Sequence, residues 1–192
     1  MKPLLALSRA IDTVNRWIGS IVIWFVLAAV LISAGNAVLR KLFSIGSNAY
    51  LELQWYLFAA VFLLGAAYTF LRNAHVRIDF VSTRLSPRVR NWVDIIGIVV
   101  FLMPLTLLLI WLSWPLVSNA YVGGEMSQNA GGLIRWPVYA LLPAGMALLF
   151  AQSLSELIKR IAFLRGLGPD SIPEEHDPVA ASLVATPDVK RT

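Results

Sequence analysis

The sequence lacks cysteine altogether, and it is poor in charge and in histidine. Without cysteine there is no disulfide, no thiolate metal site, no iron–sulfur cluster and no cysteine nucleophile. Charged residues make up 14% of the 192 residues, against about 25% in a typical globular domain. So little charge cannot cover a surface that faces water, so the composition argues against a soluble domain and predicts a surface that faces lipid.

Four long apolar stretches account for much of the 58% of hydrophobic residues. They span residues 17–39, 53–71, 95–117 and 136–154, and none contains Asp, Glu, Lys, Arg or His. Each is close to the roughly 20 residues that cross the hydrocarbon core of a bilayer as a helix. We therefore expect an all-α integral membrane protein with four transmembrane helices. The first should remain uncleaved, because its apolar run is longer than that of a signal peptide.

The positions of the 16 Lys and Arg residues predict the orientation in the membrane. Thirteen lie on one predicted side, in the N-terminal segment, the loop after the second stretch and the C-terminal segment, whereas Arg40, Lys41 and Arg135 lie on the other. Because cytoplasmic loops carry the excess of positive charge, we expect both termini in the cytoplasm. This distribution also explains the net charge of +5 without a nucleic-acid partner.

Composition divides the chain into three parts. Residues 1–16 are expected to form a cytoplasmic N-terminal segment, and residues 17–164 a four-helix membrane domain. Residues 165–192 are rich in glycine, proline and acidic residues, which predicts a disordered cytoplasmic tail.

Local signals refine the helices. Ser86 is a good N-cap and Pro87 a good first helical residue, so the third helix is expected to begin before the third apolar stretch. Pro104 is expected to kink that helix, and Pro143 to bend the fourth. The spacing of apolar residues in 78–85 predicts a short interfacial helix between the second and third spans.

The sequence bears on two alternatives to a non-catalytic subunit. A haem-carrying anchor of a respiratory enzyme needs axial ligands inside the membrane, but His75 lies in a loop and His176 in the tail. An anchor that contacts quinone without haem remains open. A self-contained carrier is disfavoured, because ionisable residues inside the membrane mark such pathways and no span has one at its centre.

Three polar features and one packing feature stand out. Glu52, at the outer end of the second span, is either a site for a cation or a partner's arginine, or a carboxylate that reaches out to water. Residues 72–79 are either a basic lipid anchor or a partner contact, and His75 and Asp79 favour the partner. The glycine-rich outer loop, 118–135, is either a connector or a contact for a partner. Small residues in the second span predict close helix packing; they are Ala59, Ala60, Gly65, Ala66 and Ala67.

Taken together, three segments resemble the small membrane subunit of tripartite ATP-independent periplasmic (TRAP) transporters. They are Glu52 with Gln54, residues 62–69 (FLLGAAYT) and residues 72–79 (RNAHVRID). The four-helix plan fits, and the resemblance covers residues 17–164. Residues 127–137 and 155–160 look like a branch often labelled as mannitol or chloroaromatic transport components.

The resemblance implies a non-catalytic scaffold, without cofactor or metal, in the inner membrane of a bacterial cell. In this family a large permease subunit carries the substrate and sodium sites, and a periplasmic binding protein delivers the substrate, commonly an organic acid. On this basis we expect five residues to contact the large subunit or hold the fold: Glu52, Arg72, His75, Arg77 and Asp79. Asn129 and Arg135 are the candidates in the outer loop.

Overall fold

The computed structural model describes residues 2–44, 46–72 and 86–168. Its elements, in chain order, are α1 (Lys2–Phe43), α2 (Asn48–Leu71), α4 (Pro87–Gly97), the π-helical turn η1 (Ile98–Leu102), α5 (Met103–Val122) and α6 (Trp136–Leu164). Because α4, η1 and α5 follow one another without a break, the described residues form four helices long and apolar enough to cross a membrane. This confirms the predicted all-α class and the four spans. The predicted helix at 78–85 and the tail beyond residue 168 lie outside the described residues.

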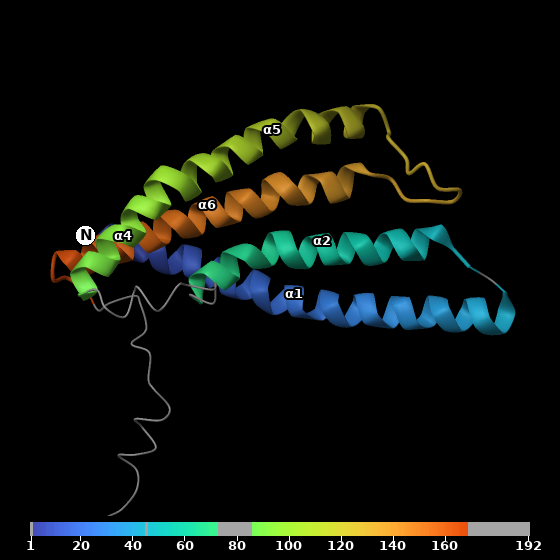
Figure 1. Ribbon diagram of the computed structural model, residues 1–192, viewed down its shortest axis with the longest axis horizontal. Coiled ribbons are helices and arrows are strands. Elements are labelled where there is room, and N and C mark those ends of the chain that lie inside the picture. Colours follow the sequence, from blue (N-terminus) through green and yellow to red (C-terminus); the bar gives the residue numbers. More distant parts are fainter. Residues whose placement is uncertain (1, 45, 73–85, 169–192) are drawn as a thin grey trace, which may run out of the picture.

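The four rods form a single layer rather than a closed bundle. α1 packs against α2, α2 against α6 and α6 against α5, and the rods lie side by side in that order (Figure 1). α1 also crosses α6 near its own N-terminus. We call the end of the layer that holds the start of α1, the end of α2, the start of α4 and the end of α6 the basic end. The opposite end, with the loop between α5 and α6, is the loop end.

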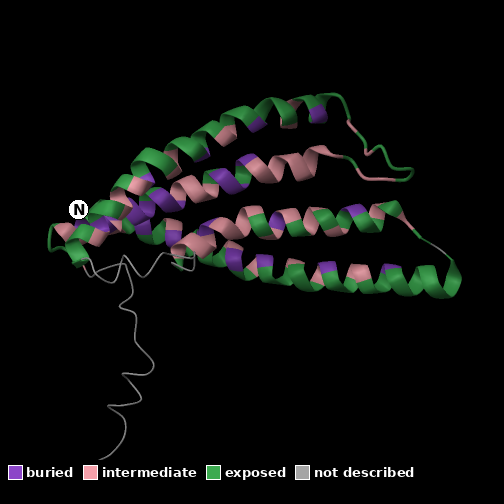
Figure 2. Cartoon of the chain, in the orientation of Figure 1, coloured by how far each residue is buried: buried purple, intermediate pink, exposed green. Residues whose placement is uncertain are grey.

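An open layer leaves much apolar surface uncovered by the chain itself. Buried residues make up 17% of the most apolar window of α1, 11% of that of α2 and 50% of that of α6. The outer faces of α1 and α5 are lined with exposed residues, many of them large and apolar (Figure 2). α6 is therefore the helix around which the layer packs, and the exposed faces require lipid or another protein.

α1 is longer than its apolar stretch, since residues 2–16 are helical and continue directly into the span. Its buried residues recur at steps of three and four or at seven: Ser8, Asp12, Asn15, Gly19, Val22, Ala29 and Asn36. Residues at this spacing lie on one face of a helix. The first part of α1 therefore packs on its neighbours with the same face as the apolar part.

The start of the third rod is confirmed. The Ser86 hydroxyl accepts a hydrogen bond from the Val89 amide at 3.4 Å, and Pro87 opens α4. The distortion expected at Pro104 takes the form of η1, in which the Met103 amide donates to the Ile98 carbonyl, five residues back. A wider turn relieves the clash between a proline ring and the carbonyl four residues earlier. The rod curves along this stretch (Figure 1), whereas α6 continues as one helix through Pro143.

Small residues set the spacing of α1, α2 and α6. A Cβ atom at Gly145 of α6 would lie 2.5 Å from the Leu63 carbonyl oxygen of α2. A Cβ atom at Gly19 of α1 would lie 2.5 Å from the Tyr68 ring of α2. Ala60 and Ala67, from the predicted small-residue pattern, are 5% and 0% exposed. Helix backbones approach each other closely only where the side chains between them are small. The backbones of α2 and α6 therefore lie close together at Gly145 and Leu63.

Gly145→Ala is expected to lower the free energy of unfolding by about 1–3 kcal/mol, because α2 and α6 must move apart to admit the methyl group. Thermal unfolding of the chain in mild detergent measures this. Gly35→Ala is the matched control, since a Cβ atom there has nothing within 4 Å. Equal unfolding midpoints for the two variants would contradict the close α2–α6 approach.

Candidate functional site

The loop between α5 and α6 has a defined shape. An isolated antiparallel bridge joins Met126 to Ile134. The Ser127 amide donates to the Leu133 carbonyl at 2.9 Å, and the Arg135 amide donates to the Glu125 carbonyl at 2.9 Å. Gly131 lies inside this hairpin with φ of +70°, a conformation that favours glycine. The loop is thus a folded hairpin rather than a slack connector.

One stripe of α2 fastens this hairpin at the loop end. Asn48, Glu52 and Tyr56 are spaced four residues apart, so they project from the same side of the helix. The Asn48 side-chain amide donates to the Ala130 carbonyl at 3.0 Å, and the Tyr56 hydroxyl donates to the Ile134 carbonyl at 3.1 Å. Glu52 lies between them, so the hairpin is bound along two turns of α2.

Glu52 is the centre of this contact and is 5% exposed. Its carboxylate accepts hydrogen bonds from the Asn129 side-chain amide at 2.7 Å and the Leu133 backbone amide at 2.7 Å. It also accepts one from the Ser127 hydroxyl. A Cβ atom at Gly132 would lie 2.8 Å from the carboxylate, so glycine makes room for it. We call Glu52, Ser127, Asn129 and Leu133 the loop clasp.

Arg135 stands beside the loop clasp at the start of α6. Its Nη1 donates to Glu125 Oε1 at 3.1 Å and to the Tyr139 hydroxyl at 3.3 Å. The hydrogen bond to Tyr139, together with the Glu125 carboxylate, raises the pKa of Arg135 above its ordinary value. Arg135 therefore stays charged and ties the base of the hairpin to the first turn of α6.

A second polar cluster lies at the basic end between α1, α4 and α6, and we call it the basic-end network. It consists of Ser8, Asp12, Asn15, Asp94, Gln152, Ser155, Glu156, Lys159 and Arg160. The Ser8 and Ser155 hydroxyls lie 2.7 Å apart, and the Asn15 amide donates to Gln152 Oε1 at 2.7 Å. These contacts join the first turns of α1 to the last turns of α6.

Ionic contacts run through the same network. Asp12 accepts hydrogen bonds from Gln152 at 3.0 Å, Ser155 at 2.7 Å and Lys159 at 3.1 Å. Lys159 also pairs with Glu156, one turn earlier on α6. Lys159 thus joins two carboxylates from two helices, and each carboxylate is nearly buried. Because a buried charge without a partner is costly, the pairing fixes where α1 lies on α6.

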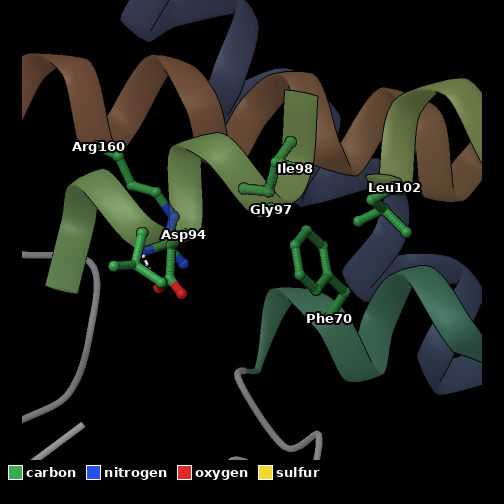
Figure 3. Close-up of a pocket in the computed structure, with 7 residues that line it drawn as sticks. Phe70, Asp94, Gly97, Ile98, Leu102 and Arg160 are labelled. Carbon is green, nitrogen blue, oxygen red and sulfur yellow. Dashed lines mark hydrogen bonds and ion pairs between the residues drawn. The ribbon is translucent and has the colours of Figure 1, made fainter. Parts of the chain in front are cut away.

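Arg160 connects the network to α4. Its side chain is 0% exposed, and its Nη1 lies 2.6 Å from Asp94 Oδ2. This pair forms one wall of a pocket of about 310 Å³ between α2, α4, η1 and α6. Figure 3 shows Arg160 and Asp94 meeting at one side and Phe70 reaching from α2 toward Leu102 at the other.

Within the described residues, no group of three or more His, Cys, Asp or Glu side chains is placed to hold a metal ion. The carboxylates of both clusters are engaged by hydrogen-bond donors or cations from neighbouring elements. The loop clasp therefore binds the hairpin to α2, and the basic-end network joins α1 and α4 to α6.

A family model of tripartite ATP-independent periplasmic transporters, DctQ component, matches residues 29–163. This chain belongs to the DctQ family. The match begins inside α1 and ends one residue before the end of α6. It therefore contains the loop clasp and the α6 side of the basic-end network, and leaves out Ser8, Asp12 and Asn15. No curated protein and no solved structure matches the chain. This DctQ component is thus a multi-pass membrane protein and a small permease subunit of a TRAP transporter.

The structure places the predicted site residues of this DctQ component in different settings. Glu52 and Asn129 meet in the loop clasp, and Arg135 stands beside it. The Glu52 side chain is buried, and its carboxylate accepts hydrogen bonds from the hairpin. Arg72 is exposed at the end of α2, far along the chain from the clasp, and its Nε donates to the Tyr68 hydroxyl at 3.0 Å. The others, His75, Arg77 and Asp79, lie outside the described residues.

The basic-end network was missed by sequence reasoning, although a signal for it exists. Ser8, Asp12 and Asn15 continue the buried face of the first span, but they fall before the apolar stretch of residues 17–39. Their partners on α6, such as Gln152 and Glu156, repeat at the same spacing across the end of the fourth stretch and just beyond it. Both sets are polar residues at helical spacing, one in the first part of α1 and one in the last part of α6. Two such polar stripes in otherwise apolar helices indicate that the helices contact each other there.

Glu52→Gln is expected to loosen the hairpin, because one carboxylate oxygen becomes an NH₂ group facing hydrogen-bond donors. A hydrogen bond to a charged group contributes about 1.5–3 kcal/mol, so the Leu133 amide should exchange its hydrogen about tenfold faster or more. Hydrogen exchange read by mass spectrometry over 123–135 measures this. Gln128→Ala, at an exposed position of the same loop, is the control. Equal exchange in both variants would show that Glu52 does not hold the hairpin.

Lys159→Met is expected to destabilise the chain by about 3–5 kcal/mol, since it leaves Asp12 and Glu156 without their shared cation. Thermal unfolding in mild detergent is the measurement, with Lys41→Met at the exposed end of α1 as control. Asp12→Asn combined with Lys159→Met should cost less than the two single changes added together. Strict additivity would contradict a direct interaction.

Proposed function

We propose that this DctQ component is the non-catalytic scaffold of its transporter. It packs in the membrane against the large permease subunit during ion-coupled uptake of an organic acid, which a periplasmic binding protein delivers. The family match over residues 29–163 carries this proposal. The family is one component of a tripartite transporter, so another membrane subunit is available to carry out the transport step.

The distribution of charge supports a scaffold rather than a carrier. Ionisable groups within the spans mark the pathways by which many carriers move ions and organic anions through a membrane. The four apolar stretches contain no Asp, Glu, Lys, Arg or His. The charged residues that the structure buries lie at the two ends of the layer, in the loop clasp and the basic-end network, where they bind one another. Sites for substrate and coupling ion therefore belong to the large subunit.

The shape of the layer supports a partner in the membrane. An open layer with exposed apolar side chains has more surface than a closed bundle of the same four helices. One face is free to meet lipid while the other packs against a second set of helices. Such a layer widens the membrane-embedded body of whatever subunit it joins.

The proposed setting is a bacterial inner membrane, with the basic end in the cytoplasm and the loop end in the periplasm. The excess of Lys and Arg at the basic end supports this orientation. We propose the same division into a cytoplasmic segment, a membrane domain and a cytoplasmic tail. Residues 2–16 of the cytoplasmic segment are helical and belong to α1. In this orientation the hairpin held by Asn129 and the charged Arg135 face the side from which a binding protein arrives.

Five residues are proposed to serve contacts with the large subunit or to hold the fold that makes them. Glu52 acts through the hairpin that it fastens, because its hydrogen bonds are made within the chain. Arg72 is exposed at the basic end. The remaining three, His75, Arg77 and Asp79, follow it in the sequence, outside the described residues, and are proposed on residue type alone.

Purification of the tagged chain from native membranes in mild detergent tests the proposal. We expect one large polytopic permease in about equal amount, identified by mass spectrometry. Cells without this chain should lose uptake, whereas liposomes with the chain alone should transport nothing. Flavin, haem or iron–sulfur subunits in place of a permease would overturn the proposal in favour of a respiratory anchor, and transport by the chain alone would overturn it in favour of a carrier.

A further inference from the structure

A groove of about 480 Å³ runs between α1 and α2 on the surface of the layer. Its walls are apolar and include Gly19, Ile23 and Val26 on α1, and Phe62, Gly65 and Ala66 on α2. From Gly19 to Val26 it extends about 10 Å along the helix axis, at 1.5 Å per residue. Ile23 is 64% exposed and Phe62 76% exposed, so no described part of the chain covers this trough.

Both walls of the groove end in arginine at the basic end. On α1 the stripe that carries Gly19, Ile23 and Val26 begins one turn earlier with Arg16. On α2 the stripe of Phe62, Gly65 and Thr69 continues one turn later to Arg72. Residues three and four apart are neighbours on one face of a helix, so each arginine extends the wall to which it belongs.

Arg72 is held in place by the ring that closes the groove. Tyr68 lines the groove, and its ring rests on α1 at Gly19, where a Cβ atom would lie 2.5 Å from the ring. Arg72 Nε donates to the Tyr68 hydroxyl at 3.0 Å, and its guanidinium carbon is 5.3 Å from the ring centroid. Arg16 is exposed, with one Nη atom 3.3 Å from the Thr13 hydroxyl. Two guanidinium groups thus stand where the apolar trough ends.

We propose that this groove binds one phospholipid with an anionic headgroup. An acyl chain lies in the trough between α1 and α2, and the phosphate and headgroup meet Arg16 and Arg72. The inference follows from charge complementarity: an apolar trough that opens on two cations matches an amphiphile with an apolar tail and a negative head. Guanidinium is suited to the task, since its N–H groups form paired hydrogen bonds with phosphate oxygens.

Native mass spectrometry of the full-length chain tests the site. The chain is taken from nanodiscs that contain phosphatidylglycerol and phosphatidylcholine in equal parts, and the retained lipid is identified. We expect one phosphatidylglycerol molecule per chain. Each arginine near a membrane surface contributes about 1 kcal/mol toward anionic lipid, so the double variant Arg16→Gln with Arg72→Gln should bind about thirtyfold more weakly.

Two further variants separate this site from general attraction to lipid. Arg88→Gln with Arg165→Gln removes the same charge from the basic end, away from the groove, and should retain the lipid. Ala66→Phe fills the trough with both arginines intact and should lose the lipid, with thermal unfolding used to confirm that the chain is folded. Equal lipid loss in the two arginine pairs, equal retention of phosphatidylcholine, or release of the lipid when the large permease subunit is added would each overturn the proposal.

Discussion

Lys159 binds two carboxylates that come from different helices, Asp12 of α1 and Glu156 of α6. In a chain with so few charges, this group lies where protein rather than water must satisfy it, and unpaired charges there would be strongly destabilising. Arg160, one residue on, carries the same constraint to Asp94 of α4. The position of three helices at the basic end therefore depends on one turn of α6.

At the loop end a single carboxylate has the corresponding role. Glu52 of α2 gathers donors from the hairpin that connects α5 to α6, so the two halves of the layer are joined there as well. Between the two ends the contacts are made by small residues such as Gly145 and Ala67. The buried polar groups thus lie at the two ends of the layer, where they bind one another, and large apolar side chains are exposed along the middle. An exposed apolar surface of this kind suits a scaffold that lies in a membrane.

The helices could be predicted from the sequence because length and absence of charge suffice to identify a span. The start at Ser86 and the distortion at Pro104 were also readable, since capping and proline act locally. Glu52 and Asn129 were singled out separately, but their contact joins residues 77 positions apart, which no local pattern reveals. The basic-end network could not be predicted because Asp12 lies before the apolar stretch, in residues 1–16, which are expected to form a cytoplasmic segment. Burial of charge depends on partners, and partners are known only once the helices are placed.

Disulfide formation in a chain without native cysteine tests the account most directly. The Ser8 and Ser155 hydroxyls lie 2.7 Å apart, so cysteines at these two positions are expected to bring their sulfur atoms close enough for a disulfide to form. We predict that the Ser8→Cys, Ser155→Cys variant crosslinks within one chain on mild oxidation in native membranes, whereas the Thr13→Cys, Ser155→Cys variant does not. Absence of the first crosslink, or equal crosslinking in both, would show that the start of α1 does not dock on α6, and would contradict the network on which the layer depends.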